Sequence, residues 1–166
     1  MLKKAYRQGA LGAMMDEYER AASELRRLVE QIPDDEFVRI VDPQTRDENC
    51  RSVQTIMAHV VSSGYGYADR IRKSFSIPST SPPDQLFSRQ EAVSQLEAML
   101  EYTVQTLEGR WEMTDEEIER ITMPTGWGVT YNLEQLLEHA IVHLLRHRRQ
   151  VEKFMLQGKI AAPSNV

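Results

Sequence analysis

Proline positions divide this chain into four long segments that contain none. Because a proline inside a helix costs about 3 kcal/mol, the proline-free segments mark where uninterrupted helices can form. The seven prolines stand at positions 33, 43, 78, 82, 83, 124 and 163. Apolar residues recur every three or four positions within the segments, with charges between them, as is typical of amphipathic helices. We therefore predict four long helices.

Capping residues indicate where these helices begin and end. The segments predicted to be helical are about 9–32, 53–75, 88–111 and 132–157. Ser88 and Glu91 form a capping-box pattern, Asn132 is a good N-cap, and Gly158 can end the last helix. A short extra helix is predicted after Thr114, and no stretch alternates long enough to predict a strand. The expected fold is an all-α four-helix bundle with long connecting loops and a short extra helix before the last helix.

Length, charge and cysteine content limit the classes of protein that fit. The 166 residues are enough for one hydrophobic core, so we expect a single domain over residues 1–166. A net charge of −5 argues against a nucleic-acid partner. The start of the chain lacks the apolar core of a signal peptide, and no apolar stretch approaches the roughly 18 residues of a membrane span. The single cysteine, Cys50, cannot form an internal disulfide, and we expect a cytoplasmic protein without a membrane partner.

Three of the four histidines stand at four-residue spacing in "EHAIVHLLRH". On a helical projection His147 falls inside the apolar arc of the last helix, His143 at its edge and His139 beyond it. Burial of an imidazole without a partner costs free energy, whereas two imidazoles at this spacing can bind one metal ion. We interpret His143 and His147 as metal ligands and His59 as the candidate third ligand. Core histidines held by hydrogen bonds are an equally open alternative.

Several other chemistries lack their sequence signatures. No H-E-x-x-H string, Glu-x-x-His motif, phosphate-binding glycine loop or G-x-S-x-G elbow is present. Cys50 precedes His59 by nine residues, about 13 Å along a helix, and is expected to be a poor co-ligand. Gly64 and Gly66 in "SSGYG" can admit a close neighbour, leave room for a ligand or mark a kink.

The histidine-bearing segments resemble the DinB/YfiT-like superfamily in "SVQTIMAHVV" and "NLEQLLEHAIVHLLRHRRQVEKF". The most specific part is H-x-x-x-H-R-x-Q, which corresponds to His143, His147, Arg148 and Gln150. The resemblance covers the whole chain in helix order and implies a four-helix bundle whose triad of His59, His143 and His147 binds a divalent metal. It also makes His139 an outer histidine.

The same resemblance implies zinc or nickel as the metal and, in many members, a homodimer. Relatives of this kind include thiol-dependent S-transferases and a mycothiol-dependent isomerase, which suggests a low-molecular-weight thiol as a co-substrate. This chain departs from simple members in "PDDEFVRIVDPQTRDENC" and "MPTGWGVTYN". Because those segments can shape a different pocket, the resemblance does not identify the substrate.

We expect a metal-dependent enzyme of the thiol-dependent S-transferase or hydrolase type that acts on a small molecule. Three imidazoles leave an open coordination position, as in catalytic zinc sites. The residues predicted to line the pocket are His139, Tyr65, Tyr67 and Trp127, although each aromatic residue also suits a core. No general base is identified, and Glu138 and Asp69 are candidates by proximity in the sequence alone.

Two interpretations from other classes stay open. One is a non-catalytic metal-binding or stress-response module, and the other is a purely structural bundle with hydrogen-bonded core histidines. The basic stretch "RHRRQVEK" is interpreted as solvated charge that suits the C-terminal half of a helix, not as a nucleic-acid surface.

Overall fold

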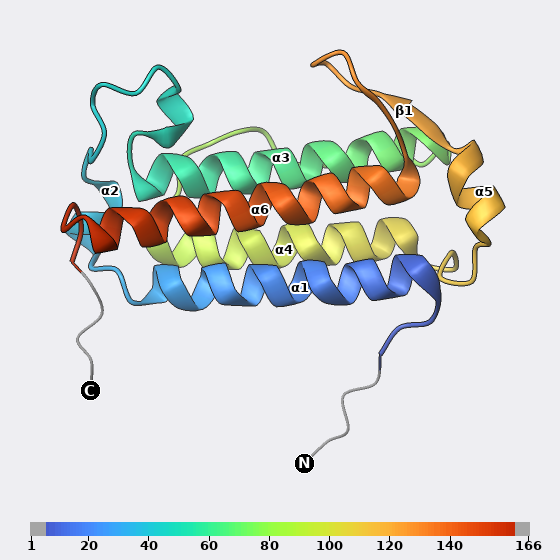
Figure 1. The fold of residues 1–166 in the computed structure, drawn as a ribbon, viewed down its shortest axis with the longest axis horizontal. Helices are drawn as coiled ribbons and strands as arrows, with labels where there is room; N and C mark the ends of the chain where they lie inside the picture. Colours follow the sequence, from blue (N-terminus) through green and yellow to red (C-terminus); the bar gives the residue numbers. More distant parts are fainter. Residues whose placement is uncertain (1–5, 162–166) are drawn as a thin grey trace.

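Four long helices lie side by side in the computed structural model, which describes residues 6–161 (Figure 1). They are α1 (Gly9–Glu30), α3 (Val53–Ser74), α4 (Arg89–Leu107) and α6 (Leu133–Leu156). The short helix α5 (Asp115–Arg120) precedes α6, as predicted. The all-α bundle is therefore confirmed, while the boundary signal at Pro163 lies outside the described residues.

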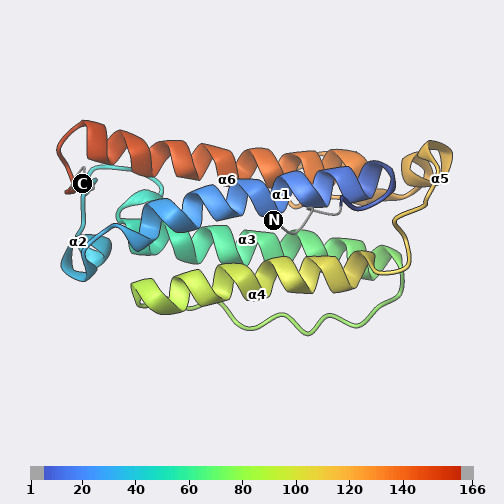
Figure 2. The same ribbon diagram turned by 90° about the horizontal axis from the view of Figure 1, so that it is seen from below.

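The connection between α3 and α4 crosses the length of the bundle, and this crossover sets the directions of the helices (Figure 2). As a result α3 and α4 run parallel, as do α1 and α6, and the two pairs run in opposite directions (Figures 1 and 2). Because α3 and α6 are antiparallel neighbours, the first third of α3, with His59, lies beside the middle of α6, with His143 and His147. This pairing brings together histidines that are far apart in the sequence.

Side-chain caps start α4 and α6 where the sequence predicts. Ser88 and Glu91 form a full capping box at α4, and the side chain of Asn132 accepts a hydrogen bond from the backbone of Gln135 at α6. The helix α4, predicted to continue to residue 111, ends earlier, at Leu107. Its apolar seam continues to Trp111, but the chain leaves helical geometry before Gly109, whose φ of +73° favours glycine.

The buried face of α4 differs from the seam that the apolar spacing predicts for this helix, which consists of Val93, Leu96, Leu100, Val104, Leu107 and Trp111. Val93, Leu100 and Val104 are only partly buried, whereas the buried positions include Ala92, Met99, Tyr102, Thr103 and Thr106. Both threonine hydroxyls donate to backbone carbonyls four residues earlier, at 3.0 and 2.7 Å, so their burial leaves no unpaired group. Gly64 admits this face, because a Cβ there would lie 2.4 Å from the Met99 sulfur.

Two local features escaped prediction. Residues before α3 form the short helix α2 (Asp34–Val38) and the 3-10 turn η1 (Glu48–Cys50). Before α6, β1 (Thr122–Pro124) and β2 (Thr130–Asn132) form an antiparallel hairpin. The expectation of no strands was wrong, since strands of three residues are too short to show alternation. The hairpin lies against the ends of α3 and α6 (Figure 1). Within residues 6–161, no helix is long and apolar enough to cross a membrane.

Candidate metal centre

Three imidazoles from two helices converge between α3 and α6. The Nε2 atom of His143 lies 3.1 Å from Nε2 of His59 and 3.3 Å from Nε2 of His147. One ring nitrogen from each residue falls within 4.8 Å of the other two. The structure thus brings together His59, His143 and His147, the predicted ligand set.

The spacing of these nitrogens fits a single small cation. Zinc binds imidazole nitrogen at 2.0–2.1 Å, so two tetrahedral ligands place their nitrogens about 3.3 Å apart. The two shortest separations match this value. Imidazole suits zinc and nickel, and the absence of a fourth His, Cys, Asp or Glu from this group within residues 6–161 agrees with an open coordination position.

Gln150 orients His147, the most buried of the three histidines at 9% exposure. The Gln150 Oε1 atom lies 3.1 Å from His147 Nδ1, where the amide oxygen accepts from the ring N–H. With the proton on Nδ1, the lone pair of Nε2 faces His59 and His143. A second partner of this kind fixes both the tautomer and the ring angle of a metal-binding histidine.

Burial keeps the triad neutral and able to donate lone pairs. Burial, together with the charges of neighbouring imidazoles, lowers the pKa of His143 to about 3. Burial also lowers the pKa of His147 and that of His59, although Asp47 and Asp84 act against it at His59. Because a metal binds only the deprotonated ring, all three histidines are in the form that coordinates at neutral pH.

Cys50 lies close to the triad without joining it. Its Sγ atom lies 3.6 Å from Oε1 of Gln150 and 3.5 Å from Oδ2 of Asp47. The expected distance of about 13 Å from Cys50 to His59 holds only for a continuous helix. In the structure α3 begins at Val53, and the η1 turn brings Cys50 against Gln150 of α6. The expectation that Cys50 is a poor co-ligand stays a prediction, and no sequence pattern indicated its contact with Gln150.

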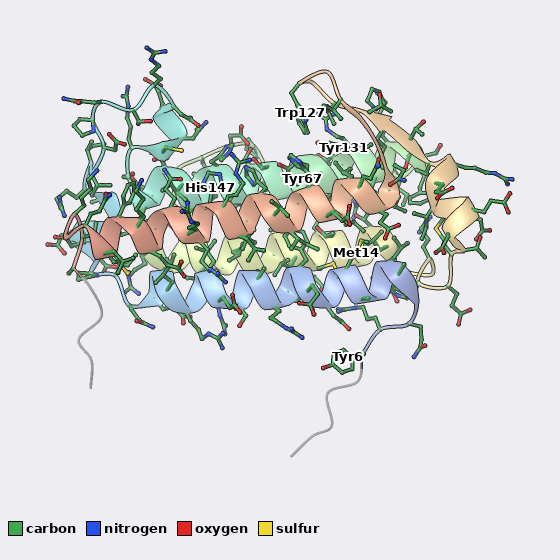
Figure 3. All side chains as sticks on the ribbon, in the orientation of Figure 1. Tyr6, Met14, Tyr67, Trp127, Tyr131 and His147 are labelled. Carbon is green, nitrogen blue, oxygen red and sulfur yellow. The ribbon has the colours of Figure 1, made fainter. Side chains whose placement is uncertain are left out.

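His139 and an aromatic cluster lie along α6 from the triad. His139 stacks on Trp127 with ring centroids 5.3 Å apart, and its Nδ1 lies 3.3 Å from the Tyr131 hydroxyl. Tyr67 contacts both His139 and His143, at centroid distances of 5.5 and 5.8 Å. Tyr67, Trp127 and Tyr131 lie close together under the hairpin, toward the start of α6 from His147 (Figure 3). The structure therefore brings Tyr67 and Trp127 to the outer side of the site.

The other three predicted residues have different surroundings. Tyr65 faces the opposite side of α3, where its ring packs 5.2 Å from that of Tyr102. Asp69 is engaged on that side as well, since its two oxygens accept from the hydroxyls of Tyr102 and Ser81 at 2.6 Å. Glu138 is exposed on α6. Neither acid is held beside the triad by a hydrogen bond within residues 6–161.

A cavity of about 350 Å³ opens beside His59. It is lined by Asn49, Ala58, His59, Ser62, Asp84, Gln85 and Leu86. Asp84 accepts a hydrogen bond from the Ser62 hydroxyl at 2.6 Å, so its carboxylate is held at the cavity wall. Sequence reasoning missed Asp84, because it sits in the irregular segment between α3 and α4, where spacing carries no information about what the chain will face.

Comparisons with known proteins agree with this architecture. The sequence matches the DinB family over residues 1–158. The fold is similar to the crystal structure of a DinB-like protein, YjoA, from Bacillus subtilis, with a TM-score of 0.60 and 16% sequence identity. The similarity covers 92% of this chain and 96% of YjoA, and at this identity it shows the fold alone. A search of curated proteins found no match.

Proposed function

Because this chain belongs to the DinB family, we propose that its histidine triad binds one divalent metal ion and makes the protein an enzyme. The ligands are His59, His143 and His147, and zinc or nickel suits them best. One observation carries the proposal: three Nε2-bearing rings from two helices converge at the separations that a shared tetrahedral ion requires.

The reaction proposed is group transfer or hydrolysis on a small molecule, of the thiol-dependent S-transferase type. When bound at such a site, the ion lowers the pKa of a coordinated thiol or water and supplies a nucleophile at neutral pH. A low-molecular-weight thiol is the proposed co-substrate. The cavity beside His59 supplies the space in which the second substrate would lie.

The surrounding residues have separate roles in this proposal. Gln150 holds the His147 ring in the tautomer that donates from Nε2. Asp84, fixed by Ser62 at the wall of the cavity that His59 also lines, is a carboxylate able to accept a proton from a substrate group. Burial raises the pKa of Tyr67 to about 12, so its hydroxyl stays protonated and can donate a hydrogen bond.

A comparison of loaded proteins tests the proposal. Zinc- or nickel-loaded wild type, His147→Asn and Asp84→Asn are assayed with small thiols plus electrophiles, and with esters and amides. We expect metal-dependent turnover in the wild type, none in His147→Asn, and reduced turnover with full metal content in Asp84→Asn. Stoichiometric metal without turnover on every substrate class would contradict the enzyme proposal and favour a non-catalytic metal-binding module.

The proposal also includes a homodimer, as the family resemblance implies, and a location in the cytoplasm, with which the single cysteine is compatible. Light scattering at several protein concentrations tests the dimer, and a mass equal to one chain at all of them would contradict it.

A further inference from the structure

Two arginines from antiparallel helices lie on the side of the bundle that carries Tyr67 and His139, Arg70 over the Trp127 ring that contacts Tyr67, and Arg146 two turns after His139 on α6. Arg70 follows Tyr67 on α3, and Arg146 follows His143 by three residues on α6, on the side that carries His139. Side chains on a helix lean toward its N-terminus. Because α3 and α6 run in opposite directions, Arg70 and Arg146 lean toward each other along the boundary between these two helices. Both charges act on the Tyr67 hydroxyl in the direction of a lower pKa, although burial outweighs them.

Neither arginine has an acidic partner. Within residues 6–161, Arg70 and Arg146 form no ion pair and donate no hydrogen bond, whereas Arg148 on the same helix is paired with Glu24 and Glu152. Lys73, one turn beyond Arg70, is likewise without an ion pair in this part of the chain. The side of the bundle that carries Tyr67 and His139 therefore presents positive charge without an acidic partner next to the triad.

The aromatic cluster shapes this positive region. The guanidinium of Arg70 lies over the Trp127 ring, 5.6 Å from its centroid, which orients the group but leaves its N–H edge available to an anion. Trp127 belongs to the hairpin connection, is 48% exposed and contacts Tyr67, with ring centroids 6.4 Å apart (Figure 3). Arg70 also lines a hollow of about 270 Å³ beneath β1, so a ligand can reach it.

Charge is distributed unequally along the site. Asp84 lies at the cavity beside His59, and its charge, with that of Asp47, acts on His59. Farther along α6 the charge of Arg146 acts on His139 and His143, and it acts on His147 as well. These charges orient a substrate that has one negatively charged end, with that end toward Arg70 and Arg146.

We propose that Arg70 and Arg146, with the Tyr67 hydroxyl between them and Trp127 above, form a subsite for the carboxylate or an equivalent anionic group of a small substrate. This inference rests on the proposed function, because the other end of the same ligand reaches the metal at the triad. Tyr67 contacts His143, and Trp127 contacts both Tyr67 and Arg70, so a chain of direct contacts joins the triad to the subsite.

Three small thiols that differ in charge test the subsite. The cobalt-loaded protein is titrated with 3-mercaptopropionate, 2-mercaptoethanol and cysteamine, and binding is followed by the thiolate-to-cobalt charge-transfer absorption. The ratio of affinities for the anionic and the neutral thiol is measured in wild type and variants, so that differences in thiol basicity cancel. Arg146→Gln and Arg70→Gln should each lower this ratio about tenfold, the effect of losing one charged hydrogen bond.

Arg149→Gln is the matched control. Arg149 is on the same helix, carries the same charge and is exposed, but it lies on the outer side of α6 and does not act on the triad. Its replacement should leave the ratio unchanged. Equal ratios in wild type and both subsite variants would overturn the proposal, as would an equal loss in Arg149→Gln.

A metal-free measurement separates this inference from the proposed function. If cobalt does not bind to the wild type, the proposed function fails. The subsite is then judged from the Trp127 indole N–H resonance, which propionate should shift in the metal-free wild type and not in Arg146→Gln. Propanol should leave the resonance in place, and no shift with propionate would overturn the subsite.

Discussion

Two buried polar clusters lie on opposite sides of α3, and they solve the problem of burial differently. Arg72 is only 8% exposed, yet its Nε donates to the Thr106 hydroxyl at 2.8 Å and its Nη1 to the Pro78 carbonyl at 3.1 Å. Its guanidinium also lies 3.7 Å from the centroid of the Tyr102 ring. Donors of one residue meet acceptors of others, so the protein itself completes this cluster.

The histidine cluster is made of three groups of the same kind. The Nε2 atoms of His59, His143 and His147 point toward one another, and the tautomer that Gln150 imposes on His147 directs a lone pair into the same space. One ring proton can join two of these nitrogens in a hydrogen bond, whereas a divalent cation can bind all three lone pairs at once. Buried groups that pair donor with acceptor, as around Arg72, indicate a structural role. Three identical rings whose lone pairs meet at one point favour a site for a metal ion.

Loss of a triad member should have the largest effect. His143→Asn is expected to lower affinity for zinc by more than about 100-fold, beyond the range seen for residues that only support a ligand. Since a buried imidazole is removed, the metal-free variant should fold at least as stably as the wild type. Competition with a chromophoric chelator measures the affinity, and unchanged zinc binding would remove the distinction between the two clusters.

Loss of Arg72 should produce the converse result. Arg72→Met leaves the Thr106 hydroxyl and the Pro78 carbonyl without their donor, which should lower the free energy of unfolding by about 2–3 kcal/mol. Zinc affinity should not change. Urea unfolding of the metal-free protein checks this, with the exposed Arg27→Met as control. A stable variant with impaired zinc binding would show that the Arg72 cluster serves the site.

Gln150 offers a smaller perturbation of the triad. Gln150→Leu keeps the bulk of the side chain but removes the acceptor for His147 Nδ1, so zinc affinity should fall about tenfold. Gln157→Leu, an exposed change at the end of α6, is the control. An affinity equal to that of the wild type would mean that helix geometry alone orients His147.

Lowering the pH should have a smaller effect, on the stability of the metal-free protein through its histidine cluster. The folded state holds the pKa of His143 at about 3, below its value in the unfolded chain, so the unfolded chain binds more protons as pH falls below about 6.5. The metal-free protein should therefore lose stability progressively between pH 6.5 and pH 3. His143→Asn should lose less over this range, and thermal unfolding at a series of pH values measures the difference. If the melting temperatures of wild type and His143→Asn fell equally with pH, the lowered pKa of His143 would be contradicted.

Much of the fold could be predicted because local signals agreed with it. Prolines and caps such as Ser88 and Asn132 defined helix ends, and a repeating apolar spacing defined buried faces. The α4 face could not be predicted correctly, because buried Thr103 and Thr106 pair with their own helix and look polar in the sequence. The hairpin was missed because its strands are only three residues long.

The site was predictable where it depended on helix periodicity. The spacing of His143 and His147 indicated a shared face, and family resemblance supported His59 as their partner. Asp84, Cys50 and the placement of Trp127 depend on irregular segments that fold back over the helices. Periodicity says nothing about such segments, so these neighbours became known only from the structure.

The central claim is that the triad holds one metal ion, and the metal content of the protein tests it most directly. Elemental analysis of the purified protein, followed by titration of the metal-free form with zinc or nickel, should give one ion per chain and a higher melting temperature. The variant that lacks all three triad imidazoles should give neither. A wild-type protein that holds no stoichiometric metal, and whose melting temperature neither ion raises, would contradict the account.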